Sequence, residues 1–551
     1  MTTRTFQFAA VLLAISTAHP VWSKGDPDAD WREGRLPAAV ERDQPRTGGT
    51  LRVRLDQEPP SLDPMTDSSL AITWLLERKV LESMAALDSS TPDYPLKPAL
   101  ATSWEISADQ LTFTFHLRRG VVWHDGVAFS GKDVVATVRK ILDPSVRALH
   151  LRNNFADLAD ISTAPGDDFT VVARYRKPYF LAFRFLATLS IYPAHSLETA
   201  GDMLHGPLHR APVGTGPFRF EEWKAGDRIS FVRNEKYWGR KAWLDRVVYR
   251  VVQDPAVGFQ LLRKGELDLY LQLQPQQWLR DLEVAGLKGK VHRIRFFNPN
   301  YNFIGWNEER PYFADARVRR AMNYAIDTEG IRKAFLFGLD RPTTCHFFLD
   351  SSACDHSLSP RPHDPGRAAK LLDEAGWVDR DGDGIRDKDG VPFRFTFLMN
   401  ADSVFLAKLC PYLQQELAKI GVAMEIKKVD WPLFTQLVNE HSFDAMSLRW
   451  GNSDVAQDPY ETWHSSQIKD GSNFVSFRNP RGDVLIEEAR TTLDDARRNE
   501  LYRQLGRILF DEAPYTFLYG RPSLDAVRVG VRGLRPSVAW YDLQDVWLVP
   551  R

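Results

Sequence analysis

The stretch FDAMSLRWGNSDVAQDPYETW, residues 443–463, decides how this chain is expected to fold. It opens with an apolar run that predicts a buried strand ending at Arg449 and Trp450. A loop of small and acidic residues follows, with Asp454 and Asp458 in it. Because ligands bind beyond the carboxyl ends of strands in open α/β sheets, a cation, a large ring and carboxylates there predict a site for a polar ligand. The alternative is an ordinary loop whose aspartates cap the next helix.

The segments around this stretch predict repeated alternation of strands and helices. A helix is expected at 315–326, and Asp364-Pro365 opens another that ends at Gly376, with Asp as the cap and Pro in the first turn. Such alternation means a sheet with helices on both faces. The remaining elements expected in this part are strands at 301–306, 393–399, 422–429, 445–449 and 515–518 and helices at 405–420, 431–440 and 494–512.

The first half of the chain predicts more mixed structure. Apolar residues alternate with arginines in 51–55, which indicates a half-buried strand, and a hairpin is expected at 102–117. Ser130 and Asp133 form the pattern of a capping box at the start of a helix. The glycine-rich stretch 212–238 is no phosphate-binding P-loop, because neither a Lys-Ser/Thr pair nor a helix follows its glycines.

The amino terminus predicts export. Residues 1–23 have a charged Arg4, an apolar region over 6–15 and a small-x-small cleavage site ending at Ser23, as in a secretory signal peptide. Cleavage after Ala18 is the second option. Residues 24–46 are expected to be a flexible leader. No cysteine lies directly after the apolar region, so no lipid anchor is indicated. No later window is apolar for long enough to cross a membrane. We expect an exported, periplasmic, soluble protein.

Composition excludes some classes of function. The 551 residues carry a net charge of −1, which gives no bulk argument for binding nucleic acid or an anionic membrane. The sequence contains no GxSxG, HExxH or P-loop motif and no Cys–His arrangement of a known local pattern, so we do not expect an enzyme.

Three cysteines leave several possibilities. In an oxidising compartment Cys345 and Cys354 are close enough in sequence to close a small disulfide loop. The alternatives are free thiols or a zinc site that recruits His346 and His356. Cys410 lies in a helical pattern and is expected to be a buried small apolar residue.

Residues 379–390 resemble the start of a calcium-binding loop. Asp379, Asp381, Asp383 and Asp387 occupy positions 1, 3, 5 and 9, with glycine at position 6. Position 12 is Gly390 instead of the glutamate that an EF-hand requires. The sequence therefore predicts no cofactor. This loop is expected either to bind a calcium ion weakly, in a structural role, or to be a polar turn without a metal.

Eight short stretches occur in one order along almost the whole mature chain. They are GGTLRVRLDQEPPSLDP (48–64), LKPALATSWEIS (96–107), LRRGVVWHDGVAFSGKDVVAT (117–137), PVGTGPF with NEKYW (212–238), KGELDL (264–269), PYFADARVRRAMNYAID (311–327), HDPGRAAKLLDEAGW (363–377) and DPYETWHSS (458–466). In this order they resemble the extracytoplasmic solute-binding proteins of ABC transporters, specifically the family 5 oligopeptide, dipeptide and nickel-binding group.

The resemblance implies an α/β fold of two lobes, the type II periplasmic-binding-protein fold, which closes on a ligand. It places the first lobe at 47–300 plus 513–551, with an extra subdomain at about 77–210, and the second lobe at 301–512. The implied function is a receptor that binds peptides between the lobes and delivers them to the membrane permease of an ABC importer. A monomer is expected, with no nucleic acid as partner.

The resemblance also assigns roles to residues 443–463. In peptide-binding relatives an aspartate after the Trp-bearing strand pairs with the peptide's α-ammonium, and the matching residues here are Asp454 and Asp458. Asp454 is the preferred candidate, and Asp458 is expected to cap the helix at Pro459. Trp450 would supply an apolar wall. Arg449 could pair with a carboxylate, although strand alternation would point it away from the cleft.

Two further hypotheses stand beside peptide transport. The same fold could bind a nickel chelate, haem, an oligosaccharide or an opine-like compound, or the chain could be an exported hydrolase. A sensory role, in which the protein presents its ligand to a membrane receptor, is compatible with the binding hypotheses.

Overall fold

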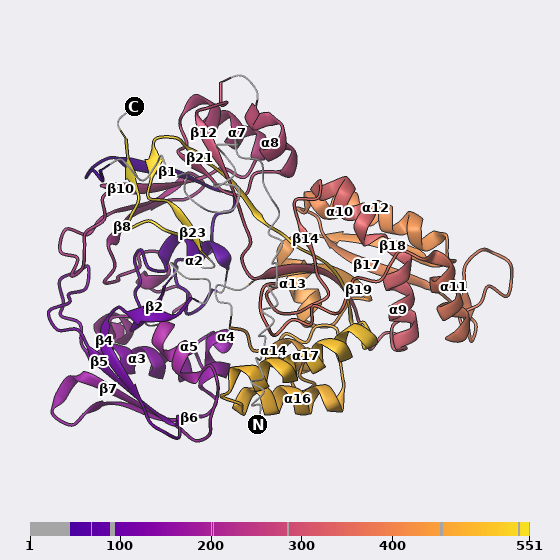
Figure 1. Cartoon of the computed structure of the whole chain (residues 1–551), viewed down its shortest axis with the longest axis horizontal. Helices are drawn as coiled ribbons and strands as arrows, with labels where there is room; N and C mark the ends of the chain where they lie inside the picture. The colour runs from indigo at the N-terminus through magenta and orange to yellow at the C-terminus, as the bar shows by residue number, and fades with distance from the viewer. Residues whose placement is uncertain are drawn as a thin grey trace, which may run out of the picture.

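The structure, a computed structural model, describes residues 44–67, 69–88, 94–199, 201, 203–283, 286–451, 456–537 and 540–549. Two lobes lie side by side, the first on the left of Figure 1 and the second on the right. This arrangement confirms the predicted two-lobed α/β fold. None of the described helices combines the length and apolar character needed to cross a membrane.

The first lobe contains a seven-stranded sheet and a separate four-stranded sheet. One continuous apolar core joins them, because residues of both sheets pack in the same buried cluster. The seven-stranded sheet has the order β12 (Val291–Phe296), β21 (Ser523–Arg528), β11 (Leu269–Tyr270), β1 (Thr50–Leu55), β10 (Arg246–Val251), β9 (Arg228–Arg233) and β8 (Phe218–Lys224); the four-stranded sheet has the order β4 (Ala101–Ile106), β5 (Thr112–Leu117), β7 (Asp167–Tyr175) and β6 (Leu158–Ala164).

Short helices and hairpins complete the first lobe. The predicted capping box is present at the start of α3, where the Asp133 carboxylate accepts from the Ser130 amide at 2.8 Å. The helices are α2 (Leu70–Leu76), α3 (Gly131–Leu142), α4 (Leu149–Arg152), α5 (Ala182–Thr188), α6 (Ala194–Thr199), α7 (Pro255–Lys264) and α8 (Pro275–Leu279), and the paired short strands are β2 (Ala85–Leu87) with β3 (Leu96–Pro98), β22 (Val531–Arg532) with β25 (Trp547–Leu548), and β23 (Arg535–Ser537) with β24 (Trp540–Asp542).

The second lobe is a six-stranded sheet with helices on both faces. Alternate residues of its strands enter different cores, so that Phe397 and Met399 pack on one side and Leu398 on the other. The order is β14 (Arg341–Pro342), β20 (Tyr515–Gly520), β13 (Asn300–Trp306), β19 (Ala445–Gly451), β17 (Arg394–Asn400) and β18 (Ala423–Val429). The covering helices are α9 (Ala316–Ala325), α10 (Thr328–Leu336), α11 (Pro365–Glu374) and α12 (Val404–Ala418) on one side and α13 (Trp431–Asn439), α16 (Pro480–Thr491) and α17 (Asp495–Glu512) on the other; α14 (Tyr460–Trp463), α15 (Gln467–Asp470) and the pair β15 (Asp387–Lys388) and β16 (Val391–Pro392) complete the lobe.

The chain crosses between the lobes twice, at neighbouring points. It leaves the first sheet after β12 and returns between β20 and β21. Asn300 ties the crossings together: its side chain donates to the Arg521 carbonyl at 2.8 Å and accepts from the Arg521 amide at 3.0 Å. Since β20 pairs with β13, residues 515–520 lie in the second sheet, although the sequence predicts that 513–551 belong to the first lobe. The sequence predicts the strand at 515–518 itself. Its partner β13 lies about 200 residues earlier in the chain, and no local pattern reveals that pairing.

The glycine-rich stretch 212–238 has a structural role. A side chain at Gly214 would place its Cβ 1.8 Å from the Val80 carbonyl, so only glycine fits there. The Glu82 carboxylate accepts from the Thr215 hydroxyl at 2.8 Å, from the Tyr237 hydroxyl at 2.8 Å and from the Trp238 indole at 2.9 Å. Burial raises the pKa of Glu82, and these three donors oppose that rise. The motif therefore fastens the first lobe around one buried carboxylate.

Candidate functional site

A cleft of about 980 Å³ lies between the lobes and is lined by residues of both. From the first lobe it receives the segment 64–87, α5 and residues around α4. From the second lobe it receives the end of β19, one side of α13 and the segment after residue 456. The end of β19 lies beside the crossings, because Gly451 pairs with Asn300 in the sheet register. The end of β19, with Arg449 and Trp450, thus lines the part of the cleft beside the crossings.

Trp450 is a fixed aromatic wall of this cleft. Its ring lies nearly parallel to Phe474, with centroids 5.7 Å apart, and to Phe303 at 6.4 Å. Its indole N–H donates to the Tyr515 hydroxyl at 3.4 Å. The side chain is half-buried, so one part packs on the second-lobe core while another part lines the cleft. Trp450 therefore lies in the cleft, and its contact with a ligand stays a prediction.

Arg449 lines the cleft as well, contrary to the expectation from strand alternation. The alternation argument fails because β19 ends here, where its last residues form the cleft edge instead of lying between two cores. Among the described residues the Arg449 side chain makes no hydrogen bond or ion pair. The surrounding cleft walls lower the pKa of Arg449 to about 10, with the charge of Arg521 acting in the same direction. At neutral pH the guanidinium is charged and free to bind an anionic group.

Asp458 also lines the cleft, but its carboxylate is already engaged. One oxygen accepts from the Tyr460 amide at 3.0 Å, although the N-cap residue of α14 is Pro459 and not Asp458. The other oxygen accepts from Arg490 at 2.8 Å and from the Tyr179 hydroxyl at 3.0 Å. A carboxylate with these three donors offers little to a ligand ammonium. Asp454, the preferred candidate for that role, lies outside the described residues.

Several contacts across the cleft had no signal in the sequence. The Asn153 side chain of the first lobe donates to Glu461 of the second at 2.7 Å. The Phe180 amide donates to the Arg490 carbonyl at 3.0 Å, and the Arg498 guanidinium lies 4.3 Å from the centre of the Phe180 ring. We call Tyr179 and Phe180, together with these second-lobe partners and Asp458, the interlobe contact. It joins segments about 300 residues apart, and no local motif encodes such a pairing.

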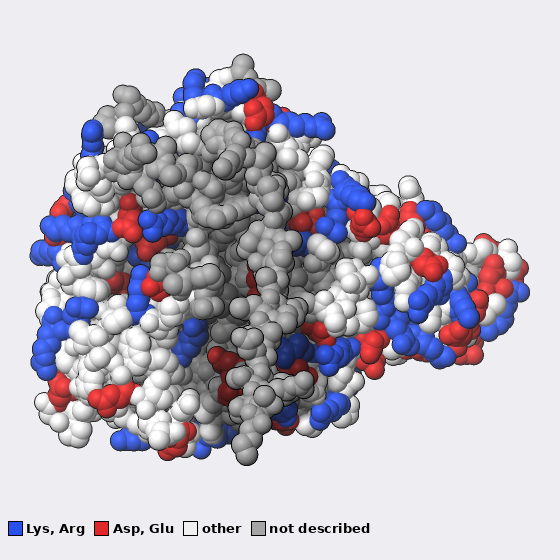
Figure 2. Space-filling view, in the orientation of Figure 1, with Lys and Arg blue, Asp and Glu red and all other residues white. Residues whose placement is uncertain are grey.

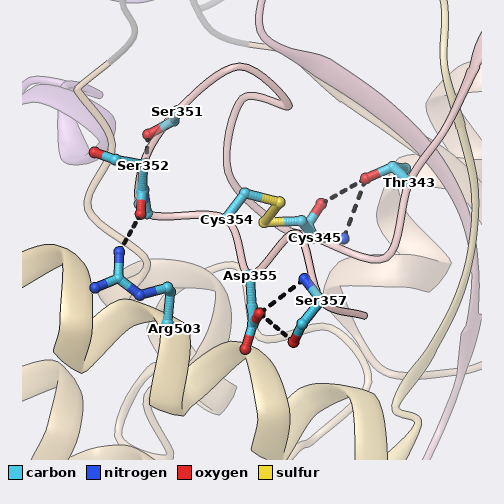
Figure 3. Close-up of a disulfide and its surroundings, with 9 residues drawn as sticks. Thr343, Cys345, Ser351, Ser352, Cys354, Asp355, Ser357 and Arg503 are labelled. Atoms are coloured by element: carbon cyan, nitrogen blue, oxygen red, sulfur yellow. Dashed lines mark hydrogen bonds between the residues drawn. A yellow bond between two sulfur atoms is a disulfide. The ribbon is translucent and has the colours of Figure 1, made fainter. Parts of the chain in front are cut away.

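Cys345 and Cys354 form a disulfide, with their Cα atoms 5.8 Å apart (Figure 3). Figure 3 also shows that Arg503 of α17 donates to the Ser352 carbonyl, at 2.6 Å, which fastens this loop to the helix. The zinc alternative does not fit, because the disulfide uses both sulfurs and His346 Nδ1 is hydrogen-bonded to the Tyr301 hydroxyl at 2.8 Å. Burial lowers the pKa of His346 to about 3. Cys410 is buried, which raises its thiol pKa to about 12.

The calcium-like loop brings three of its four aspartates together. Carboxylate oxygens of Asp379, Asp381 and Asp383 lie within 4.8 Å of one another, and all three residues are exposed. Asp387 is not part of this group, because its carboxylate accepts from Arg380 at 2.8 Å. Asp379 oxygens accept from two glycine amides of the loop, at 2.8 and 3.1 Å. The loop is a compact turn held by its own amides.

Comparison with known proteins identifies the family of this fold and site. Residues 95–471 match the family described as "Bacterial extracellular solute-binding proteins, family 5 Middle". The chain is 27% identical over 519 residues to the oligopeptide-binding protein AppA of Bacillus subtilis, with 92% of each chain covered. It is 29% identical over 469 residues to the heme-binding protein A of Haemophilus influenzae, with 81% of each covered.

Solved structures agree with this comparison. The structure of Bacillus subtilis AppA in complex with a nonapeptide superposes with a TM-score of 0.82 at 26% identity, covering 92% of this chain and 100% of that one. The structure of NikZ from Campylobacter jejuni in complex with Ni(L-His) gives a TM-score of 0.78 at 25% identity, covering 88% and 95%. Most of this chain therefore superposes on these two proteins.

Proposed function

Because the chain belongs to the bacterial extracellular solute-binding proteins of family 5, we propose that it binds peptides in the cleft between its lobes and delivers them to the permease of an ABC importer. The observation that carries this proposal is the cleft itself. It is large enough for several residues of a peptide, it is walled by aromatic rings, and it holds the unpaired cation of Arg449. Similarity to an oligopeptide-binding protein over nearly the whole chain supports the same ligand class.

In this proposal each part of the site has a role. Arg449 pairs with a ligand carboxylate through charge-assisted hydrogen bonds. Trp450 and Trp431, whose side chain is 44% exposed, give apolar surface to ligand side chains. Asp454 pairs with the α-ammonium of the peptide. The export signal at residues 1–23 would place the receptor in the periplasm as a soluble monomer.

The test begins with the protein as purified from cells. Denaturing the native preparation and extracting it for mass spectrometry should release bound peptides, and unfolding temperatures should rise with increasing concentrations of added peptides of two to nine residues. A preparation that carries no peptide and responds to none would overturn the proposal. It would leave the family and the fold untouched.

The same experiment addresses non-peptide ligands. One relative is named for haem and another is solved with a nickel–histidine complex, and an unpaired arginine also suits the carboxylate of an amino-acid chelate. Thermal shifts with haem, Ni(L-His) and oligosaccharides identify such a ligand if peptides fail. Steady product formation from a peptide pool would instead indicate an exported hydrolase, which we do not expect from this family.

A further inference from the structure

A second pocket lies on the second lobe, between α9, α11 and the carboxyl end of α17. Its volume is about 670 Å³, and none of its lining residues lines the interlobe cleft. Figure 2 shows basic side chains gathered with acidic ones on the right-hand lobe, where Figure 1 places α9 and α11. The pocket is lined by four arginines, Arg317, Arg320, Arg361 and Arg367, by the rings of Tyr324 and Phe510, and by Glu374 and Asp511 at the ends of their helices.

Helical spacing brings these side chains together. Arg317, Arg320 and Tyr324 are three and four residues apart on α9, so they share one helix face. Arg367 and Glu374 are two helical turns apart on α11, so they also share one helix face. Phe510 and Asp511 belong to the last turn of α17. The arrangement therefore rests on rigid helices, which hold the cationic groups in place.

One of the four arginines is fully engaged within the protein. Arg317 donates to Asp315 and, at 2.6 Å, to the Glu374 carbonyl. Arg361 lies 3.9 Å from the centre of the Phe510 ring and donates to the Phe510 carbonyl at 2.9 Å, which leaves most of its N–H groups unused. Arg367 lies 4.4 Å from the centre of the Tyr324 ring. Stacking of this kind fixes a guanidinium plane while its edge stays open to an anion.

The other cations lack carboxylate partners. Among the described residues, no carboxylate lies within ion-pair distance of Arg320, Arg361 or Arg367, although Glu374 and Asp511 are on the rim. The Nε atom of Arg320 is buried and has no hydrogen-bond acceptor. Burial lowers the pKa of Arg361, Tyr324 and the charge of Asp511 oppose that change, and the nearby charge of Arg320 acts in the same direction as burial. Arg320 and Arg361 repel each other, and the three guanidinium groups offer unused donors that a bound anion would engage.

We propose that this pocket binds a small organic anion, a phosphate or carboxylate carried on an apolar body, at a site separate from the transport cleft. The anionic group binds among Arg320, Arg361 and Arg367, since guanidinium groups match the geometry of phosphate and carboxylate oxygens. The apolar body rests against Phe510 and Leu371, which line the same pocket. The pocket is much larger than an inorganic ion, so an organic anion fills it better than free phosphate does.

The experiment is isothermal titration calorimetry of the full-length mature protein with phenyl phosphate and with inorganic phosphate, at one ionic strength set with sodium chloride. We expect saturable binding at one site, tighter for phenyl phosphate. The double variant Arg320→Gln/Arg367→Gln should weaken that affinity by about tenfold or more. The matched control Arg147→Gln/Arg263→Gln removes two exposed charges elsewhere and should keep the wild-type affinity.

Two results would overturn the proposal. One is the absence of saturable binding of either anion to the wild-type protein. The other is an equal loss in both double variants, which would indicate only general attraction to a basic surface. If Arg320→Gln/Arg367→Gln proves unstable by circular dichroism, Arg367→Gln alone serves as the variant, because this side chain is exposed and makes only the contact with the Tyr324 ring. That variant should still bind phenyl phosphate more weakly than the control does.

Discussion

Arg449 and Asp458 lie in the same cleft, but their charges have different surroundings. Asp458 is satisfied by Arg490, Tyr179 and a backbone amide, whereas Arg449 has no partner among the described residues. A charge that the protein does not neutralise is the one available to a ligand, because a buried ion pair already in place would have to be broken first. The ligand is therefore expected to present an anionic group near the crossings.

Substitution of Arg449 tests this expectation. In Arg449→Gln, the affinity for a peptide with a free carboxyl terminus should fall about 10- to 100-fold, because a hydrogen bond between charged groups contributes about 1.5–3 kcal/mol. The same peptide with an amidated carboxyl terminus should bind equally to variant and wild type. Calorimetric titration of both peptides measures this difference. Arg478→Gln, a surface arginine paired with Glu309, is the control, and equal losses for both peptides would contradict the carboxylate role.

A buried carboxylate on β21 makes the stability of the first lobe depend on pH. Asp525 accepts from Gln272 and Ser523, both at 2.8 Å, and from the Tyr541 hydroxyl at 2.6 Å. Burial raises the pKa of Asp525 to about 6. Since this value is above that of the unfolded chain, the folded protein holds the proton more tightly. The contribution of Asp525 to stability is present below about pH 4 and is lost as the pH rises through about 6.

The corresponding variant is Asp525→Asn. Wild-type protein should lose up to about 3 kcal/mol of unfolding free energy from this group between about pH 4 and pH 7, at about 1.4 kcal/mol for each unit of pKa shift. The variant should lack that part of the dependence. Urea unfolding at the two pH values gives the comparison. An identical change in unfolding free energy for both proteins would show that Asp525 titrates normally.

At the level of helices and strands, local chemistry made much of the second lobe predictable. Asp364 caps α11, with Pro365 in the first turn, as the sequence indicated, and α9 lies in the predicted segment 315–326 with Asp315 as its cap. The alternation of strands and helices along the chain also predicted a sheet with helices on both faces. The pairing of β20 and the direction of Arg449 were not predictable, because each depends on which distant strand lies alongside. The interlobe contact escaped detection for the same reason.

The turn at 379–387 gives a prediction at this scale. Its carboxylates already accept from backbone amides and from Arg380, so the turn should keep its shape without a metal ion. We expect the unfolding temperature to be the same in a chelator and in millimolar calcium. Asp381→Asn should likewise respond to neither. A calcium-dependent rise that this variant abolishes would instead assign a structural ion to the loop.

For the whole molecule, the two crossings and the interlobe contact limit how the lobes move. The crossings are tied together at Asn300, which leaves rotation about this point as the simplest motion. Away from the crossings, Phe180 lies between Arg498 and Tyr502 of α17. The centres of the Phe180 and Tyr502 rings are 6.2 Å apart. Opening the cleft must therefore separate Phe180 from the second lobe. The contact therefore favours the arrangement of the lobes in which Phe180 touches α17.

Removal of this contact should shift the protein toward the open state. In Phe180→Ala the lost aromatic and cation–π contacts are each worth about 0.5–1.5 kcal/mol, enough to change the ratio of open to closed molecules several-fold. Small-angle X-ray scattering should give a larger radius of gyration for the ligand-free variant than for the wild type. Saturating ligand should bring both to the same compact value, because binding favours the closed state in each. Phe169→Ala, on β7 and away from the cleft, is the control, and an unchanged radius of gyration in Phe180→Ala would show that the interlobe contact does not set the equilibrium.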